Sequence, residues 1–424
     1  MIFEAASTML MGGISLYAYL KQNGATNDQQ RIQKLFTLSG LNVKHGGKTY
    51  TAQLVRKKQH DWGVQYVYRI PEGRQFSDYE DKIGILKDGL NNRAAKFNLK
   101  SFLKKEKLGG HKEVELSFDG MLHVKVYDQP FPTEIPYLTE DTKDWKVPLG
   151  VKRDSKEVYL DFEKTPHVGL GGATRYGKSN LLNSIIISLL HSQPNNTEFT
   201  FIDLKGGVEL CDYENLKQTQ SIAYEPEEAL KALEAAYNGM RKVQNKLKGK
   251  AKKVQDAGLL KRHFIIIDEV GELNPAEATD KADKKLKEEC QRYMSQIARL
   301  GAGLGYRLIV ATQYPTGDVI PRAVKQNCDV KICFRVRNST ASQVVLDEGG
   351  AEKLPAVKGR AIVQLADKQE ILQTFFINTE VISQVSSPYI TNISKRVVLA
   401  DEEESIISEA GANTFILEET RFSD

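Results

Sequence analysis

The chain is poor in cysteine and histidine. It has four cysteines in 424 residues, none of them in a Cys-x-x-Cys pair, which indicates no disulfide framework and fits a reducing compartment. The seven histidines are scattered without the spacing of metal ligands, so ordinary surface or core histidines account for them. The sequence therefore indicates neither a disulfide-stapled domain nor a zinc site.

The chain also lacks a strong excess of charge of either sign. Its net charge is +4, which is too weak by itself to argue for a nucleic-acid partner. Hydrophobic residues make up 41% and charged residues 27% of the chain, as in folded globular proteins. A length of 424 residues exceeds what one core usually holds, so we expect two or three domains.

A long hydrophobic run is missing as well. The uncharged stretch from Ala5 to Leu20 is shorter than the roughly 20 apolar residues of a full membrane span. No basic segment precedes it, so a cleaved signal peptide is not indicated. Two interpretations stay open. Residues 1–21 are a membrane anchor with the rest of the chain on the cytoplasmic face of the cell membrane, or they are a first helix of a cytoplasmic protein.

The following segments predict a small α+β domain. Residues 22–46 are polar and fit a linker or a short helix. In 47–130, "KTYTAQLVRKK" and "WGVQYVYRIP" alternate like half-buried strands, and Ile83, Leu86 and Leu90 have helical spacing. Asp119-Gly120 marks a hairpin turn. The proline-rich stretch 131–145 is a second linker.

Residues 146–380 predict a larger α/β domain. Apolar strands such as "FTFID", "HFIIIDE" and "YRLIVATQ" alternate with helical patterns such as "KSNLLNSIIISLLHS". Strands that are apolar throughout and separated by helices indicate a mainly parallel sheet that is covered on both faces. Residues 381–424 form the expected C-terminal tail, which is acidic from Asp401 onward.

One segment of this domain carries a phosphate-binding motif. "GATRYGKS" matches G-x-x-x-x-G-K-[ST] and stands between a strand and a helix, as in P-loop proteins. The glycines turn the backbone N–H groups toward phosphates, Lys178 contacts the β/γ oxygens, and the Ser179 hydroxyl ligates Mg²⁺. We assign ATP contacts to Gly172, Ala173, Thr174, Arg175, Tyr176, Gly177, Lys178, Ser179 and Asn180.

Two further strand ends complete the predicted site. "FIIIDE" ends in Asp268, which would hold Mg²⁺ through water, and Glu269, which would polarise the attacking water. "IVATQ" ends in Gln313, at the sheet edge where ligands of open α/β sheets bind. Gln313 either senses the γ-phosphate or is simply a polar strand end.

These linked segments resemble the FtsK/SpoIIIE family of DNA-pumping ATPases. The resemblance covers roughly 145–365 and includes "TPHVGLGGATRYGKSN", "FTFIDLKGGVEL", "FIIIDEVGEL" and "ATQYPTGDVIPRAVKQNCD". It implies a RecA-like P-loop NTPase motor. Leu204 replaces the family's usual proline, and Gln343 replaces a common arginine. The family's long linker and its C-terminal winged helix are absent, so the chain is more similar to the family's short conjugative coupling proteins of Gram-positive mobile elements.

The resemblance also implies partners and further site residues. Family members work as hexameric rings around double-stranded DNA, with an arginine from the neighbouring subunit completing each ATP site. Arg299 is the preferred candidate for that arginine, and Arg292 and Arg307 are its rivals. Arg322, Lys325 and Lys331 follow "ATQ" and are the expected DNA contacts, because a pore grips the phosphate backbone. A relaxase and membrane transfer machinery are the remaining implied partners.

Three functions stay open from the sequence. The first is an ATP-driven DNA translocase that serves conjugative transfer of a plasmid or integrative element. The second is the same motor in chromosome or phage DNA handling. The third is an ATP-binding scaffold that docks a relaxase and turns over little ATP, which the intact Glu269 argues against.

Overall fold

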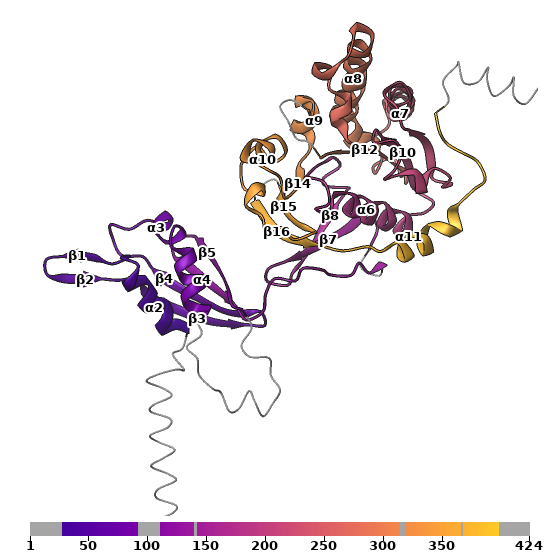
Figure 1. Cartoon of the computed structure of the whole chain (residues 1–424). Helices are drawn as coiled ribbons and strands as arrows, with labels where there is room; N and C mark the ends of the chain where they lie inside the picture. The colour runs from indigo at the N-terminus through magenta and orange to yellow at the C-terminus, as the bar shows by residue number, and fades with distance from the viewer. Residues whose placement is uncertain (1–27, 92–110, 140–141, 314–318, 366–367, 398–424) are drawn as a thin grey trace, which may run out of the picture. The chain divides into compact units, whose positions relative to one another are not determined.

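The computed structural model describes residues 28–91, 111–139, 142–313, 319–365 and 368–397 (Figure 1). The chain divides into two compact units, Met1–Phe131 and Pro132–Asp424. Residues 1–21, for which a membrane anchor was one of two interpretations, lie outside the described residues. Within the described residues, no helix is both long and apolar enough to cross a membrane.

The first unit is an antiparallel sheet with helices packed on one face. The strand order in this sheet is β3-β4-β6-β5, and a separate hairpin of β1 and β2 precedes it. Buried tyrosine, leucine and valine side chains on one sheet face pack against the helices and form the core. The elements are α2 (Asp28–Leu38), β1 (Val43–His45), β2 (Lys48–Tyr50), β3 (Gln53–His60), β4 (Gly63–Arg69), α3 (Phe76–Glu80), α4 (Ile83–Asn91), β5 (Glu113–Phe118) and β6 (Leu122–Tyr127).

The hairpin predicted at Asp119-Gly120 and the helix predicted around Leu86 are both present. The stretch "KTYTAQLVRKK" differs from the expectation, since it is divided between β2 and β3. A helix and a strand, α2 and β1, occupy most of the region that the sequence suggested as a linker or short helix.

The second unit is built on a ten-stranded sheet with the order β11-β10-β12-β13-β9-β14-β15-β16-β7-β8. Its strands are β7 (Lys146–Lys152), β8 (Glu157–Asp161), β9 (Val168–Gly171), β10 (Thr197–Asp203), β11 (Thr219–Ala223), β12 (Arg262–Asp268), β13 (Tyr306–Thr312), β14 (Val330–Phe334), β15 (Arg360–Leu365) and β16 (Lys368–Thr374).

The expectation of a mainly parallel sheet needs correction, because the sheet is mixed. Strands β11 through β14 in the sheet order are parallel, whereas β15, β16, β7 and β8 continue it with antiparallel pairing. Short connections explain two of these pairs: β15 ends at Leu365 and β16 begins at Lys368, β7 ends at Lys152 and β8 begins at Glu157, and connections this short permit only antiparallel pairing.

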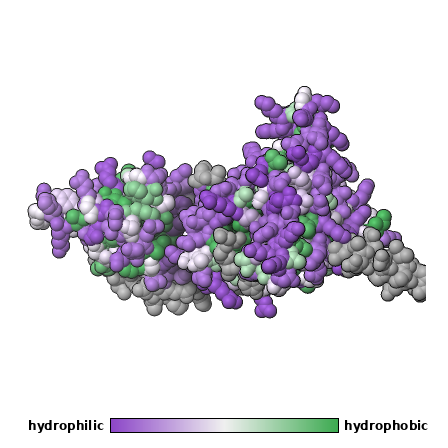
Figure 2. Space-filling model, turned by 90° about the horizontal axis from the view of Figure 1, so that it is seen from above, coloured by the Kyte–Doolittle hydropathy of each residue, from purple (hydrophilic) through white to green (hydrophobic). Residues whose placement is uncertain are grey.

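Helices cover both faces of this sheet (Figure 1). On β12, Phe264 and Ile266 pack in the core with α6, while Ile265 and Ile267 pack with α7 and α8. Because both faces of β12 are buried, its sequence is apolar throughout. The surface of the unit seen in Figure 2 is predominantly hydrophilic. The helices are α6 (Lys178–Ser192), α7 (Pro226–Leu247), α8 (Lys281–Leu304), α9 (Arg322–Asn327), α10 (Ser339–Leu346) and α11 (Thr379–Ser386).

Two segments expected to lie outside the motor domain are part of this unit. Tyr137, in the stretch suggested as a linker, donates its N–H to the Phe376 carbonyl at 2.9 Å. Helix α11 packs on α6, so the expected boundary at residue 380 falls inside a helix. Residues 390–397 then follow the edge strand β11, where the Val397 N–H donates to the Ile222 carbonyl at 2.9 Å. The acidic part of the tail, from 398 onward, lies outside the described residues.

Candidate functional site

Four neighbouring parallel strands end at one edge of the large sheet. In the order β10-β12-β13-β9, they end at Asp203, Asp268, Thr312 and Gly171. Because the carboxyl ends of parallel strands share an edge, segments far apart in the sequence become neighbours there. This edge holds the phosphate-binding loop and both predicted acidic residues.

Glycine is required at both ends of the phosphate-binding loop, residues 172–177. Gly172 has φ of 155°, and a Cβ at this position would lie 2.6 Å from the Phe334 Cβ. Gly177 has φ of 115°, and a Cβ there would lie 3.1 Å from the Gly359 nitrogen. Helix α6 begins directly afterward at Lys178, so its N-terminal N–H groups face the loop.

Backbone hydrogen bonds hold this loop from two sides. The Ala173 N–H donates to the Arg335 carbonyl at 3.0 Å, and the Gly359 N–H donates to the Tyr176 carbonyl at 2.9 Å. The Tyr176 ring packs against the main core, whereas Arg175 is exposed with φ of 71°. The loop is therefore fixed by β14 and by the turn before β15, and its Arg175 tip faces outward.

Lys178 and Asp268 form a buried ion pair. The Lys178 Nζ contacts Asp268 Oδ1, and the two side chains are 3% and 0% exposed. The second carboxylate oxygen, Oδ2, is buried and has no hydrogen-bond partner among the residues that the structure describes. Ser179 follows Lys178 at the start of α6. A carboxylate oxygen and a serine hydroxyl are the kind of oxygen ligands that Mg²⁺ prefers.

Glu269 is also buried and fully hydrogen-bonded. Its Oε1 accepts the Thr312 hydroxyl at 2.8 Å, and its Oε2 accepts the Gln313 backbone N–H at 2.9 Å. The residue has φ of 63°, a left-handed conformation that is uncommon for a residue with a side chain. This turn after β12 directs the carboxylate toward the end of β13, where it contacts Gln313.

The Gln313 side chain joins three strand ends. Its Oε1 accepts the Thr174 hydroxyl at 2.9 Å and also the Lys205 ammonium. Thr174 belongs to the phosphate-binding loop and Lys205 follows β10. A movement of the Gln313 side chain would therefore change its contacts with both segments.

Lys205 is a residue that sequence reasoning did not place in the site. Its position in the sequence could have indicated a place in the site, because it follows the apolar strand "FTFID" at the carboxyl edge of the sheet. The buried Asp203 carboxylate shapes this turn by accepting the N–H groups of Lys205, Glu209 and Leu210 at 3.2, 2.9 and 2.9 Å. The loop that carries Lys205 is thus held in place by Asp203.

Asn180 differs from its predicted role as an ATP contact. Its Nδ2 donates to the Ile377 carbonyl at 2.7 Å and its Oδ1 accepts the Ile377 N–H at 3.3 Å. Both polar atoms of the side chain are thus committed to the segment before α11. The Asn180 side chain ties α6 to that segment instead of facing the phosphate site.

The three candidate arginines have different surroundings. Arg299 is exposed on α8, where its Nε donates to the Ser295 carbonyl at 3.2 Å. Arg292 is exposed on the same helix, pairs with Glu289 and lies over the Tyr293 ring. Neither lies in the site of its own chain. Arg307 is fully buried, which removes it as a candidate for reaching into a neighbouring subunit.

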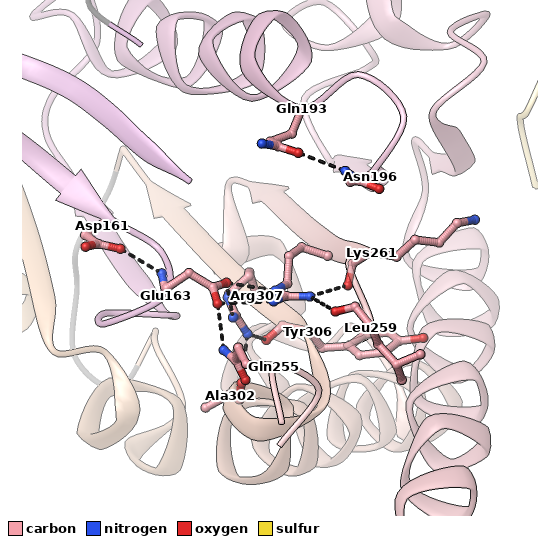
Figure 3. Close-up of polar contacts among 11 residues, drawn as sticks. Asp161, Glu163, Gln193, Asn196, Gln255, Leu259, Lys261, Ala302, Tyr306 and Arg307 are labelled. Atoms are coloured by element: carbon pink, nitrogen blue, oxygen red, sulfur yellow. Dashed lines mark hydrogen bonds and ion pairs between the residues drawn. The ribbon is translucent and has the colours of Figure 1, made fainter. Parts of the chain in front are cut away.

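Arg307 belongs instead to a charged network at the opposite edge of the sheet (Figure 3). Glu163 accepts from Arg307 Nη2 at 3.0 Å and from Arg262 Nε at 2.8 Å, and it accepts from Gln255 at 2.7 Å. Burial alone would raise the pKa of Glu163, but the hydrogen bonds and charges of Arg262, Gln255 and Arg307 outweigh it and lower the pKa to about 2. Desolvation lowers the pKa of Arg307 to about 10.

Replacing Glu163 by glutamine should destabilise the protein by about 3 kcal/mol, because two buried guanidinium groups lose their counter-charge. The folded pKa of Glu163, about 2, lies below the reference value of 4.5, so its stabilisation is present above pH 4.5 and is lost as the pH falls toward 2. Denaturant unfolding across this pH range should therefore show that the free energy of unfolding falls less steeply with decreasing pH in Glu163→Gln than in the unaltered protein. Glu289→Gln, which breaks an exposed pair with Arg292, is the control and should cost under about 1 kcal/mol.

The predicted DNA contacts lie around a groove of about 650 Å³. Lys325 pairs with Asp347 at 2.6 Å, and Lys331 pairs with the same carboxylate. Arg322 is exposed at the start of α9. Lys331 lies in register with Gly169 near the amino ends of β14 and β9. The groove is therefore at the sheet edge opposite the phosphate-binding loop, and the structure does not bring these cations to the ATP site.

Comparison with known proteins identifies the domain. Residues 136–263 match the FtsK/SpoIIIE family. The chain is 30% identical over 288 residues to the DNA translocase FtsK of Leptospira interrogans, covering 63% of this chain and 27% of that protein. It is 30% identical over 272 residues to the DNA translocase SpoIIIE of Bacillus subtilis, covering 59% and 33%. The aligned part of the chain thus spans about a third or less of these relatives.

Solved structures share the fold over more of the chain. The pCW3 conjugation coupling protein TcpA, in a monomer form with ATPγS, superposes with a TM-score of 0.59 at 22% identity, covering 85% of this chain and 99% of that one. The cytoplasmic domain of the type VII secretion ATPase EccC of Thermomonospora curvata gives a TM-score of 0.50 at 23% identity, covering 62% and 32%. The chain therefore carries an ATPase domain that is similar to the FtsK/SpoIIIE family, with the family match at residues 136–263.

Proposed function

We propose that the protein is an ATP-driven DNA translocase that moves DNA during conjugative transfer of a plasmid or integrative element. The observation that carries the proposal is the buried Glu269 carboxylate, held by Thr312 and Gln313 at the same sheet edge as the phosphate-binding loop. A positioned carboxylate beside a phosphate site is what hydrolysis requires, whereas a passive scaffold would not need it. Relatives at 30% identity are DNA translocases.

The residues of the site divide the work of hydrolysis. Lys178 leaves Asp268 and places its charge on the β/γ-phosphate oxygens, which releases Asp268 Oδ1. Asp268 and Ser179 would hold Mg²⁺, which would supply positive charge against the phosphates. Glu269 orients the attacking water and accepts its proton. Gln313 senses the γ-phosphate and passes its state to Thr174 and Lys205, the side chains that it already contacts.

A ring of six subunits would place each site against a neighbour. Arg299 is the arginine proposed to act across that contact, since it is exposed on α8 and makes only a local hydrogen bond to its own helix among the described residues. A guanidinium from a neighbour stabilises transition-state charge and contributes about 10³–10⁵ in rate in NTPases. The surface pairing of Arg292 with Glu289 makes it the weaker candidate.

The DNA contacts proposed for the motor domain are Arg322, Lys325 and Lys331. Lys325 and Lys331 share one carboxylate, so the groove that they line keeps net positive charge with Arg322. Such cations bind the phosphate backbone with little sequence preference. Conjugative transfer is favoured over chromosome handling because the likeness to the TcpA fold extends over 85% of this chain.

Duplex DNA should stimulate ATP hydrolysis several-fold, with the stimulated species having six times the 47.6 kDa mass of one chain. Steady-state hydrolysis with and without duplex DNA, combined with mass measurement of the assembly, tests this expectation. A scaffold that docks a relaxase would bind ATP but show no stimulation, and that result would remove the motor. Deletion of the gene tests the cargo. If deletion impaired chromosome segregation and left transfer of the element intact, the motor would act on chromosomal DNA.

A further inference from the structure

Positive charge is concentrated in one part of the first unit. Residues 29–60 contain no aspartate and no glutamate, although the whole chain has a net charge of only +4. The basic residues in this stretch are Arg31, Lys34, Lys44, Lys48, Arg56, Lys57 and Lys58. Neither the ATP site nor the proposed motor groove uses any of them.

Two of these cations lie on the sheet face opposite the one that packs against the described helices α2 and α4. Lys58 is in register with Gln65 of β4, and Arg56 is in register with Val67. The alternating residues Tyr66 and Tyr68 are buried against the helices. Because side chains alternate across a strand, Arg56 and Lys58 point to the opposite, open face. Arg69 of β4 has the same orientation and is exposed.

The polar side chains beside Arg56 and Lys58 on this face make hydrogen bonds and ion pairs with one another. Gln65 lies between two histidine rings, 3.2 Å from His60 Nε2 and 2.7 Å from His123 Nδ1. Farther along, Lys125 is paired with Glu115 at 2.6 Å. By contrast, Arg56 and Lys58 form no ion pair within the described residues, so their charges remain available to an anionic ligand.

The β1–β2 hairpin, which directly precedes β3 in the chain, adds a basic arm. It projects from the rest of the unit (Figure 1) and turns at Gly46-Gly47, both with positive φ. Lys44 and Lys48 are exposed on its two strands. At its base, Arg74 Nη2 donates to the Gly40 and Asn42 carbonyls at 2.6 and 3.2 Å. The arm is thus fixed at one end, and a two-stranded ribbon of this kind fits the major groove of DNA.

We propose that this surface, formed by Arg56, Lys58, Arg69 and the arm residues Lys44 and Lys48, binds the phosphate backbone of duplex DNA. It is a second DNA contact outside the motor domain, and it rests on the proposed function only for the identity of the cargo. Arg56 and Lys58 stand two residues apart on β3, about 6.8 Å, which is far enough for each to contact a separate phosphate of the backbone. Contacts to phosphate alone make the binding independent of sequence.

The double variant Arg56→Glu/Lys58→Glu tests the proposal in the full-length protein. Its affinity for a labelled duplex of arbitrary sequence should fall about ten-fold or more at low salt, and the log–log salt slope should shrink by about 2, because two phosphate contacts are lost. The matched control is Lys34→Glu/Lys87→Glu, which makes the same charge change on exposed positions of α2 and α4. It should bind DNA nearly as the unaltered protein does, and all three proteins should melt alike.

Two further readouts separate this surface from the motor. At saturating DNA, Arg56→Glu/Lys58→Glu should reach the same stimulated ATPase rate, with only the half-saturating DNA concentration raised. If DNA did not stimulate ATP hydrolysis by the unaltered protein but the variant still lost DNA binding, the proposed surface would be supported and the proposed motor would be wrong. Unchanged DNA affinity would overturn the surface. Loss of binding to vesicles of anionic phospholipid with DNA affinity intact would also overturn it and assign the face to a membrane.

Discussion

Lys178→Ala is expected to abolish ATP hydrolysis and also to destabilise the nucleotide-free protein by about 3–5 kcal/mol. The second effect follows from the ion pair, since removing the Lys178 ammonium leaves the Asp268 carboxylate buried without a counter-charge. If the Lys178 ammonium lay in solvent without an ion pair, its removal would abolish hydrolysis without destabilising the protein. Denaturant unfolding and ATPase activity, measured on the same preparation, separate the two effects.

The double variant Lys178→Ala/Asp268→Asn provides the control. Removing both charges should restore most of the lost stability, while hydrolysis stays absent because both phosphate and Mg²⁺ contacts are gone. Lys205→Ala is a second control, since Lys205 contacts the neutral Gln313 side chain and its loss uncovers no buried carboxylate in that contact. If Lys178→Ala unfolded at the same denaturant concentration as the unaltered protein, the buried pair would not exist in solution.

The sequence predicted the centre of the site well because the motif is local. In "GATRYGKS" the spacing alone fixes the loop, and the strand–loop–helix order places Lys178 and Ser179 at a helix start. Asp268, Glu269 and Gln313 were predicted at one edge because each ends an apolar strand. Parallel strands bring such ends together whatever the sequence distance between them, and the structure has these strands in that arrangement.

What the sequence did not predict depends on long-range pairing. The strands β16, β7 and β8 are each buried over only part of their length, so their sequences do not show where they join the sheet. Lys205 and Asn180 carry no motif that tells a phosphate contact from a contact with the protein itself. The sequence suggested Arg307 as an available arginine because its partly buried partner, Glu163, lies 144 positions away in the sequence.

Glu269→Gln should lower the hydrolysis rate by about 10²–10⁴-fold while leaving nucleotide binding and stability nearly unchanged. Glutamine keeps the shape of the side chain: its carbonyl oxygen can accept the Gln313 N–H, and its amide can donate to the Thr312 hydroxyl. What it loses is the ability to accept a proton from water. Single-turnover hydrolysis and nucleotide binding should be measured together. Glu272→Gln, an exposed acid three positions later, is the matched control and should hydrolyse ATP normally.

Mixing Glu269→Gln with Arg299→Ala subunits should restore hydrolysis, because some contacts then join an intact Glu269 to an intact Arg299 from the neighbour. Each variant alone would be nearly inactive, since every site in a uniform assembly lacks the same group. Recovery on mixing requires that the two groups act from different subunits on one site. The same mixture with Arg292→Ala in place of Arg299→Ala is the control. Activity of Arg299→Ala alone at the normal rate would rule out this arginine, and full loss that mixing does not rescue would place Arg299 in its own subunit's site.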